Sequence, residues 1–484
     1  MDINFLSRFI KGVISTSLGL FIQIVLGFVG LMIAARFVLK EEFGVFILIQ
    51  VIATLFGILS TLALEGISVT KFITNVKEKD RVDIVNTALS FRILISVMMC
   101  FFIFLCKPLI HVMFKSEQLS QLFIYIPIFF ILNSLNEILL NILQGFHQYR
   151  KMAISQVING VFRLFFIIVF LIVLKMSVIG LICAFLFSFT ASVLFQFLVI
   201  PVKKKFNFSL IIYKKILKFG FPLGLNSVLT FIFTRIDRFM IGAMISPLGV
   251  AHFEIASRIP DSSRRMFESF RAVYFPNISE LFAKKKYTEA ENVLNASLRL
   301  ISFLTIFVAL VALLFQKEII CLLFSDRYLE SAPTLSILML SLSIGLIGNV
   351  LGTSLVAFGQ SDKPAKINLV NTITNVVGNV IMIPIFGFIG AAYAALISRC
   401  ATNPLNVWFL KKAGIRVEIS QYLKPIIVFG VPWFLFVFFK PENIIIKLSL
   451  LISFFIFCIL LSIIKKKDIS VLFEGIRPSA HAIK

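Results

Sequence analysis

Charged residues recur at helical spacing within residues 248–276, a stretch that is otherwise largely apolar. Five of them alternate in sign at intervals of four, three, four and three residues: Glu254, Arg258, Asp261, Arg265 and Glu268. This spacing places all five on one face of a helix, and Arg264 and Arg271 form a second stripe beside it. Arginine stays charged and grips phosphate through paired hydrogen bonds, so the surplus arginines predict an anion-binding surface. The alternative is a self-neutralising helix whose ion pairs serve only its packing.

Other charged residues also lie in apolar surroundings, where charge is costly and normally faces a cavity or a partner. Arg163 lies near the middle of the apolar stretch 153–174 and is a second candidate for contact with an anion. Asp237 is a candidate ligand for a cation, unless it pairs with a neighbouring arginine. Glu65 and Glu137 carry side chains that can titrate, although interhelical hydrogen bonding is the commoner role for such residues.

The elements that carry these residues are expected to cross a membrane. Of the 484 residues, 59% are apolar and only 15% are charged, and the mean hydropathy is +0.99. These values exclude a soluble enzyme, a coiled coil and a disordered scaffold. A membrane helix needs about 20 mostly apolar residues. Fourteen stretches qualify when the charged one is counted: 12–35, 43–64, 85–106, 120–144, 153–174, 178–200, 216–244, 248–276, 291–315, 333–358, 365–386, 388–410, 422–439 and 445–464. The sequence therefore predicts an all-α polytopic membrane protein with about 14 transmembrane helices.

The basic residues predict the orientation of these helices, because cytoplasmic loops carry an excess of Lys and Arg. With a cytoplasmic N-terminus and fourteen crossings, 28 of the 47 basic residues fall in cytoplasmic segments, nine in exterior loops and ten within spans. Both termini are then cytoplasmic, and the net charge of +23 reflects loop charge and no nucleic-acid partner. All ten basic residues within spans are arginine. Arg92, Arg299 and Arg399 lie near cytoplasmic ends, where a long side chain can snorkel to the interface.

The chain also contains a weak internal repeat. Phe43-Gly44-Val45 recurs as Leu248-Gly249-Val250, and residues 153–159 and 179–184 have similar counterparts at 365–371 and 389–394. These matches predict two pseudo-symmetric six-helix lobes, two additional transmembrane helices and a basic cytoplasmic tail, with the bounds 1–215, 216–412, 413–464 and 465–484. Parallel repeats around a central substrate site are a transporter architecture.

Motifs of catalytic and cofactor sites are missing from the sequence. It has no Walker A loop, no H-E-x-x-H pattern and no dinucleotide-binding fingerprint, and its six cysteines and four histidines do not form a metal-binding pattern. The predicted exterior loops are short, whereas a membrane glycosyltransferase or polymerase usually carries a sizeable extramembrane loop. A protein that is not an enzyme, with no cofactor or metal, is therefore expected.

Several segments then resemble one family. Ala35-Arg36 followed by Phe43-Gly44-Val45-Phe46 is similar to its pattern after the first helix, although Val38-Leu39-Lys40 replaces the usual Leu-Gly-Pro. Gly220-Phe221-Pro222, Asp237-Arg238-Phe239 through Gly242, the charged eighth span and Gly390-Ala391-Ala392-Tyr393-Ala394 are similar to later signatures. Together, over residues 8–412, they resemble the polysaccharide flippases of the multidrug/oligosaccharidyl-lipid/polysaccharide (MOP) exporter superfamily.

This resemblance implies a MATE-like fold whose two six-helix bundles enclose a cationic cavity that opens alternately to each side. The implied substrate is a polyprenyl-pyrophosphate-linked oligosaccharide, moved to the outer leaflet of a prokaryotic cell membrane in exchange for Na⁺ or H⁺. Membrane lipid and the polysaccharide polymerase machinery are the expected partners. The residues expected to bind the substrate are Arg258, Arg265, Arg271, Arg264, Arg163 and Arg36. The residues expected to bind the coupling ion are Asp237, Glu254 and Glu65.

Three other functions remain open at this stage. A lipid II flippase for peptidoglycan also resembles a fourteen-helix layout. A cation-coupled multidrug exporter would be expected to have twelve helices and an acidic, aromatic cavity. A membrane polymerase or ligase acting on the same lipid carriers would be expected to have a large exterior loop.

Overall fold

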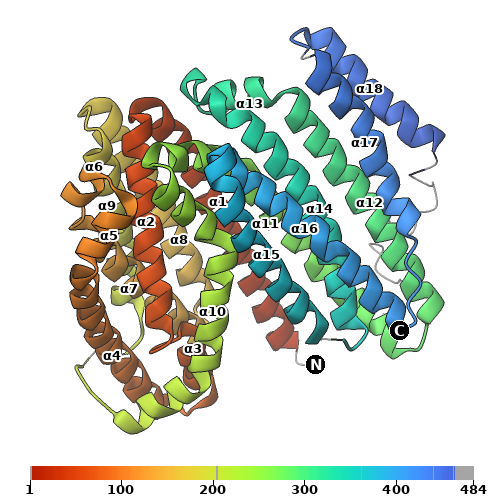
Figure 1. The fold of residues 1–484 in the computed structure, drawn as a ribbon. Coiled ribbons are helices and arrows are strands. Elements are labelled where there is room, and N and C mark those ends of the chain that lie inside the picture. The colour runs from red at the N-terminus through yellow and green to blue at the C-terminus, as the bar shows by residue number, and fades with distance from the viewer. Residues whose placement is uncertain (1–2, 203–204, 361, 440, 462, 464–484) are drawn as a thin grey trace. The chain divides into compact units, whose positions relative to one another are not determined.

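The computed structural model describes residues 3–202, 205–360, 362–439, 441–461 and 463, and all regular secondary structure within these ranges is helical (Figure 1). The predicted basic tail, 465–484, lies outside the described residues. The chain divides into two compact units, Met1–Ala251 and His252–Lys484, here called unit 1 and unit 2.

Unit 1 is built from long apolar helices joined by short ones. Its elements are α1 (Ile3–Phe37), α2 (Lys40–Thr61), α3 (Gly66–Asn75), α4 (Glu78–Leu105), α5 (Lys107–Phe114), α6 (Glu117–Gln121), α7 (Tyr125–Gly145), α8 (Tyr149–Ile167), the π-helical turn η1 (Ile168–Val173), α9 (Val178–Val199), α10 (Leu210–Met244) and the start of α11 (Pro247–Ala283). Helix α1 runs beside α8, and α2 packs against α7 and α10. The core between these helices is made almost wholly of Leu, Ile, Val and Phe. Burial of these apolar side chains stabilises the packing of the long helices, and it also holds the short helices and loops against them.

Glycines set the closest helix contacts in unit 1. A Cβ atom added at Gly44, near the start of α2, would lie 1.8 Å from the carbonyl oxygen of Pro247. A Cβ atom at Gly19 of α1 would lie 2.8 Å from the Cα atom of Ala153 on α8. Both positions therefore need a residue without a side chain. Pro247 directly precedes Leu248-Gly249-Val250, the segment that repeats Phe43-Gly44-Val45, so the two repeated segments lie close together.

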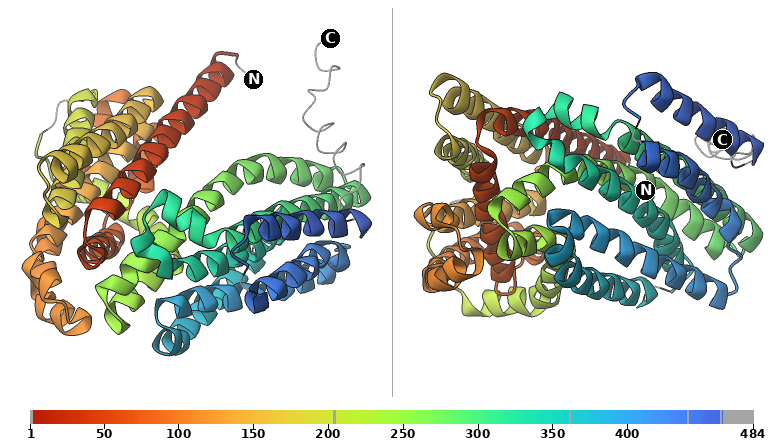
Figure 2. Two further views of the ribbon diagram at one scale, coloured as in Figure 1. Left: turned by 90° about the horizontal axis from the view of Figure 1, so that it is seen from above. Right: turned by 45° about the horizontal axis from the view of Figure 1, so that its top comes forward.

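Unit 2 contains the rest of α11 and a series of long helices. Its elements are α12 (Tyr287–Leu314), α13 (Gln316–Leu323), the 3₁₀ turn η2 (Asp326–Ser331), α14 (Ala332–Ala357), α15 (Asp362–Phe386), α16 (Phe388–Lys412), α17 (Ile419–Phe439) and α18 (Ile444–Leu460). Helices α15 and α16 form a tight hairpin and lie side by side in Figures 1 and 2. Gly387 makes its turn with a φ of 64°, and a Cβ atom at Gly390 would lie 2.1 Å from the carbonyl oxygen of Met382. The residues of the Gly390-Ala391-Ala392 segment therefore have small side chains because α15 and α16 approach each other closely there.

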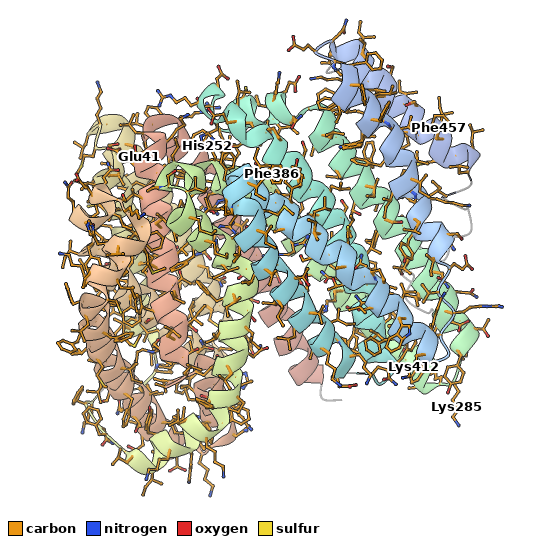
Figure 3. All side chains as sticks on the ribbon, viewed as in Figure 1. Glu41, His252, Lys285, Phe386, Lys412 and Phe457 are labelled. Atoms are coloured by element: carbon orange, nitrogen blue, oxygen red, sulfur yellow. The ribbon has the colours of Figure 1, made fainter. Side chains whose placement is uncertain are left out.

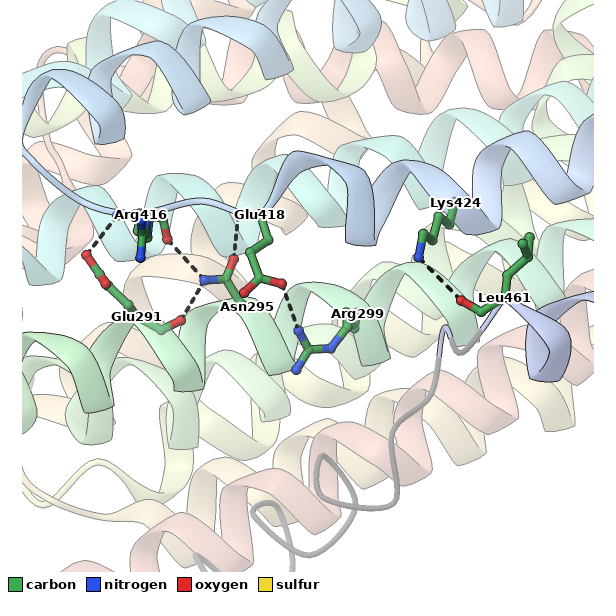
Figure 4. Close-up of polar contacts among 7 residues, drawn as sticks. All are labelled: Glu291, Asn295, Arg299, Arg416, Glu418, Lys424 and Leu461. Carbon is green, nitrogen blue, oxygen red and sulfur yellow. Dashed lines mark hydrogen bonds and ion pairs between the residues drawn. The ribbon is translucent and has the colours of Figure 1, made fainter.

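A polar clasp holds the connection between α16 and α17 against α12 (Figure 4). The side-chain amide of Asn295 donates to the carbonyl oxygen of Arg416 at 3.0 Å and accepts from the backbone N–H of Glu418 at 2.8 Å. Glu291 accepts from the backbone N–H of Arg416 at 2.8 Å, and the guanidinium of Arg299 lies 3.5 Å from the carboxylate of Glu418. The clasp ties the last two helices to the unit at one end of α12.

Each of the fourteen predicted spans overlaps a helix, although 43–64 and 120–144 also include turns, and the count of fourteen is not confirmed. Eleven helices within the described residues are long and apolar enough to cross a membrane, and α18 is apolar but has only 17 residues. The charged helix α11 and the helix α16 are long enough but are not among the eleven. Residues 66–75, 107–114 and 316–323, between predicted spans, form short helices, and a further short helix at 117–121 overlaps the start of the predicted span 120–144.

The predicted lobe boundary at residues 215 and 216 stays a prediction. Unit 1 extends to Ala251 and includes α10, which the sequence assigns to the second lobe. Compactness and internal repetition are different properties, because a helix can belong to one repeat and pack against the other.

Candidate functional site

The charged helix α11 carries most of the predicted anion site, and its arginines have acidic neighbours one turn away. Nη2 of Arg258 lies 2.5 Å from Oε1 of Glu254, whose side chain is only 2% exposed, while that of Arg258 is 32% exposed. The Nε atom of Arg258 is buried and has no hydrogen-bond partner within the described part of the chain. Arg258 therefore neutralises a buried carboxylate and still has donor capacity left.

The next two pairs on α11 are looser. Nη2 of Arg264 lies 3.6 Å from Oδ1 of Asp261, and Nη1 of Arg271 lies 3.5 Å from Oε2 of Glu268. Both partners of the second pair are more than half exposed. Ion pairs of this kind are worth at most about 1 kcal/mol, so a polyanion can displace them. The side chain of Arg265 lies outside what the structure describes.

The alternative interpretation, in which the charges of α11 neutralise one another, agrees only partly with these contacts. Each described arginine of the two stripes has an acidic neighbour, but the stripes contain four arginines against three acidic residues. One positive charge is left over, and the assignment of these arginines to an anion stays a prediction.

Arg163 contacts aromatic and polar side chains within unit 1. Its guanidinium carbon lies 4.3 Å from the ring centroid of Phe185 and 5.5 Å from that of Phe189, both on α9. Its Nη2 donates to Oδ1 of Asn159 at 2.6 Å, and Gln23 of α1 donates to the same oxygen at 3.1 Å. The positive charge is thus held by π faces and a neutral amide.

Arg36 lies in the last turn of α1 and is exposed, whereas Ala35 and Val38 on either side of it are fully buried. Asp237 lies on α10 and is half-buried. Glu254, a candidate for the coupling ion, is the buried partner of Arg258. A cation that bound Glu254 would therefore have to compete with that guanidinium.

Glu65 begins α3, directly after the break that ends α2. Its Oε2 accepts from the backbone N–H of Ile67 at 2.7 Å and from that of Ser68 at 3.2 Å, so the carboxylate caps the new helix. The side chain is only 5% exposed. Burial raises the pKa of the Glu65 carboxyl above its ordinary value, against the effect of the two N–H groups, and the charge of Glu137 raises it further.

Arg92 was expected to have a structural role, and its contacts are structural, but they differ from the expected ones. Snorkelling to the interface was expected, but the residue is fully buried on α4. Its Nη1 donates to Oγ of Ser60 at 3.0 Å and its Nη2 donates to the carbonyl oxygen of Leu64 at 2.8 Å. The break between α2 and α3 leaves that carbonyl without a helical partner, and a long cationic side chain from a neighbouring helix satisfies it.

The predicted site residues fall into two groups. Arg36, Arg163, Asp237 and Glu65 belong to unit 1, and Glu254, Arg258, Arg264 and Arg271 belong to unit 2. Within unit 2, His252 lies near the start of the charged helix (Figure 3). It is buried, with Nδ1 2.9 Å from Oγ of Ser331 and its ring stacked on Phe388. His252 is thereby held against η2 and α16 within unit 2.

Comparison with solved structures defines the class of fold. The chain matches an inward-closed conformation of the lipid II flippase MurJ with a TM-score of 0.69, at 16% identity, over 97% of this chain and 99% of the other. It matches an inward-facing multidrug resistance MATE family transporter of the MOP superfamily with a TM-score of 0.65, at 15% identity, over 83% and 99%. The protein therefore has the fold of the MOP-superfamily transporters.

Sequence comparison then identifies the family. Residues 33–333, more than half of the chain, match the family described as polysaccharide biosynthesis protein, and the chain belongs to it. A relative from Haloferax volcanii, the probable low-salt glycan biosynthesis flippase Agl15, is 24% identical over 197 residues, which are 40% of this chain and 42% of the relative. The matched region thus spans less than half of that relative's length.

Proposed function

We propose that this protein is a flippase that moves a polyprenyl-pyrophosphate-linked oligosaccharide from the cytoplasmic to the outer leaflet of a prokaryotic cell membrane, for the synthesis of a surface polysaccharide. Three findings support this proposal: membership of the polysaccharide biosynthesis family, a relative named as a glycan flippase, and the MOP transporter fold. The observation that carries the choice of substrate is the density of arginine on α11.

The chemistry of such a substrate fits the arginines. A pyrophosphate diester carries two negative charges and several acceptor oxygens, which suit the planar forks of guanidinium groups. The loose pairs of Arg264 and Arg271 can open to meet it, because exposed ion pairs cost little to break. A flippase breaks no covalent bond, so the proposed site needs anion binding and no catalytic residue.

The proposed transport cycle is alternating access with counter-transport of Na⁺ or H⁺, and both termini lie in the cytoplasm. Asp237, Glu254 and Glu65 are the candidates for the coupling ion. Glycan polymerisation follows on the outer side, so association with the polymerase machinery belongs to the same proposal.

The test is glycan export in a cell from which the gene has been deleted. The wild-type gene is expected to restore surface polysaccharide and to clear the lipid-linked precursor from the cytoplasmic leaflet. Arg258→Ala and Arg271→Ala are expected to lower export at least tenfold, with partial recovery in the Lys variants. Lys284→Ala is the matched control, because Lys284 also pairs with an acidic residue one turn away but lies beyond the predicted span. Full export with normal expression in all arginine variants would remove the site assignment.

The same cells separate the competing functions. A lipid II flippase would rescue a strain that lacks its own peptidoglycan precursor flippase, and a drug exporter would raise resistance to cationic dyes. Neither outcome is expected if the glycan flippase proposal holds.

A further inference from the structure

The hairpin of α15 and α16 ends, within unit 2, in a row of two lysines and two aromatic rings. Nζ of Lys363, in the first turn of α15, lies 5.6 Å from the ring centroid of Phe409. The ring centroids of Phe409 and Trp408 are 4.6 Å apart, and Nζ of Lys412 lies 5.2 Å from the Trp408 ring. We call these four residues the hairpin end. The proposed substrate and coupling sites include none of them.

The hairpin end has more positive charge than its neighbouring acidic residue can neutralise. Asp362 serves two lysines at once, with Oδ2 2.8 Å from Nζ of Lys363 and 3.4 Å from Nζ of Lys366. Lys411 and Lys412 lie in the last turn of α16, are exposed, and form no ion pair within the described part of the chain. Four lysines thus accompany one carboxylate.

Other acidic residues at this end of unit 2 are already engaged. Glu280 and Glu289 pair with lysines of the connection between α11 and α12, at 2.5 and 2.9 Å between Oε1 and Nζ. Glu418 pairs with Arg299 in the clasp, and Glu291 accepts from a backbone N–H there. None of these carboxylates therefore compensates the lysines of the hairpin end.

The surplus of positive charge belongs to one end of unit 2. Lys285 and Lys412 lie at that end (Figure 3). Its connecting segments hold nine basic and five acidic residues, in 280–291, 360–366 and 411–424. The connecting segments at the other end hold four of each, in 316–331 and 440–447. The basic end is the one that the excess of Lys and Arg predicts to face the cytoplasm, and the cytoplasmic leaflet carries anionic lipid.

An exposed apolar stripe of α16 leads to the hairpin end. Its exposed residues follow one another at three or four positions, in the order Tyr393, Ile397, Cys400, Pro404 and Trp408. Lys412 follows Trp408 one turn later, whereas Ser398, Thr402 and Asn406 on another face of the helix are buried. The stripe is about 22 Å long, which covers one leaflet of a hydrocarbon core about 30 Å thick.

The chemistry of the hairpin end and the stripe is that of a phospholipid contact. Ammonium groups attract a phosphate, and an indole ring prefers the level of the headgroups, where its N–H can donate. The apolar stripe offers a surface to an acyl chain. A soluble phosphate would engage the lysines but not the stripe, and an acidic protein in the cytoplasm could not reach the stripe within the hydrocarbon layer.

We propose that the hairpin end binds an anionic phospholipid, with its phosphate beside Lys412, its headgroup over the ring of Trp408 and one acyl chain along the exposed stripe of α16. Lys363 and Lys411 add attraction from either side. The proposal does not depend on which substrate is transported, so its failure would leave the proposed function untouched.

Quenching of tryptophan fluorescence by brominated lipids tests this proposal, because the chain has only two tryptophans. Trp433→Phe leaves Trp408, which is 53% exposed, as the single reporter at the hairpin end. In phosphatidylcholine vesicles, we expect dibrominated phosphatidylglycerol to associate at Trp408 about fivefold more strongly than dibrominated phosphatidylcholine, since one lysine near the membrane surface contributes about this factor. Trp408→Phe is the matched control. It reports from the exposed Trp433, about 21 Å along α17 from its start, where a ratio of about one is expected.

Charge variants in the Trp433→Phe background locate the site. Lys411→Gln/Lys412→Gln is expected to lower the ratio to about one, because it removes the unneutralised charges. Lys411→Arg/Lys412→Arg keeps both charges and should keep the ratio. Lys317→Gln, at an exposed position of the other end of unit 2, should also leave it unchanged. Replacing chloride by inorganic phosphate at equal ionic strength is expected to have no effect.

Four results would overturn the proposal. A ratio of about one at Trp408 would show that the hairpin end does not select anionic lipid. An equal preference at Trp433 would make the selection a property of the whole surface. A preference that survives Lys411→Gln/Lys412→Gln would exclude these lysines, and a preference that inorganic phosphate abolishes would make the hairpin end a site for a soluble anion. The first two results need no lysine variant.

Discussion

Arg258 and Glu254 form an ion pair at 2.5 Å in which the carboxylate is almost completely buried and the guanidinium is not. The asymmetry matters because it gives the two residues different roles. Glu254 needs a partner in order to stay ionised, whereas Arg258 can meet a second anion from its exposed side. The pair is one helical turn apart on α11, so it forms as soon as the helix forms.

Removing one member of this pair is expected to destabilise the protein. Arg258→Ala removes the guanidinium that pairs with the buried carboxylate of Glu254, and breaking a buried ion pair from one side typically costs about 3–5 kcal/mol. The double variant Glu254→Gln/Arg258→Gln removes both charges and should recover most of the loss. Thermal unfolding in detergent measures both effects. Equal stability of the single variant and the wild type would mean that Glu254 is neutral or solvated.

The aromatic contacts of Arg163 predict a difference between arginine and lysine. Arg163→Lys keeps the charge but loses the planar stacking on Phe185 and the hydrogen bond to Asn159. Because each contact is worth about 1 kcal/mol, we expect a loss of about 1–3 kcal/mol in the free energy of unfolding. Arg163→Ala should cost more, and Lys151→Ala, which removes a cation that contacts the backbone of Val199, serves as the comparison on the same helix. An unchanged unfolding midpoint in Arg163→Lys would contradict this prediction.

Two glycines of α2 provide a matched pair of substitutions. Gly44→Ala places a Cβ atom 1.8 Å from the carbonyl oxygen of Pro247, so the helices must separate and the yield of folded protein should collapse. Gly57→Ala meets nothing within 4 Å, and the higher helix propensity of alanine should make this variant neutral or stabilised by up to about 1 kcal/mol. Size-exclusion profiles and unfolding midpoints distinguish the two, and similar behaviour of both variants would show that α2 does not approach Pro247 closely.

The clasp at the end of α12 predicts a local effect on the last two helices. Asn295→Ala removes the amide that holds the backbone of both Arg416 and Glu418, and the two part-buried hydrogen bonds that are lost are worth about 1 kcal/mol each. Limited proteolysis should then cleave the segment 413–418 faster than in the wild type. Asn277→Ala, an exposed position on α11, is the control and should leave the cleavage rate unchanged. If Asn295→Ala is cleaved at the wild-type rate, the prediction is wrong and apolar packing alone holds α17 in place.

The raised pKa of Glu65 predicts how stability changes with pH. The folded protein holds a proton at Glu65 over a pH range in which the unfolded chain has released it, because burial raises the carboxyl pKa. This contribution is complete below the ordinary glutamate pKa and is lost as the pH rises through the raised value. The unfolding midpoint of the wild type should therefore fall with rising pH across that window, and Glu65→Gln should flatten this part of the profile. An identical slope in the variant would place the proton elsewhere.

The sequence by itself determined the helices and their class. Apolar stretches of about 20 residues specify spanning helices because the bilayer leaves a backbone no other hydrogen-bond partner, and each of the fourteen predicted stretches does overlap a helix. The spacing of the α11 charges likewise places Glu254 and Arg258 one turn apart before any tertiary structure is known. Both features depend only on residues that are close together in the sequence, so the sequence alone can predict them.

Tertiary structure alone decided what the isolated charges contact. Arg92 does not snorkel, because the break between α2 and α3 offers it the carbonyl oxygen of Leu64 in the interior. The aromatic rings that contact Arg163 belong to α9, and Asn141 of α7 packs onto Gly66 at the start of α3. Such contacts join residues from 22 to more than 70 positions apart, and helix crossings set them. No spacing along the chain encodes them, so the charge that a sequence places inside the membrane acquires its partner only when the helices assemble.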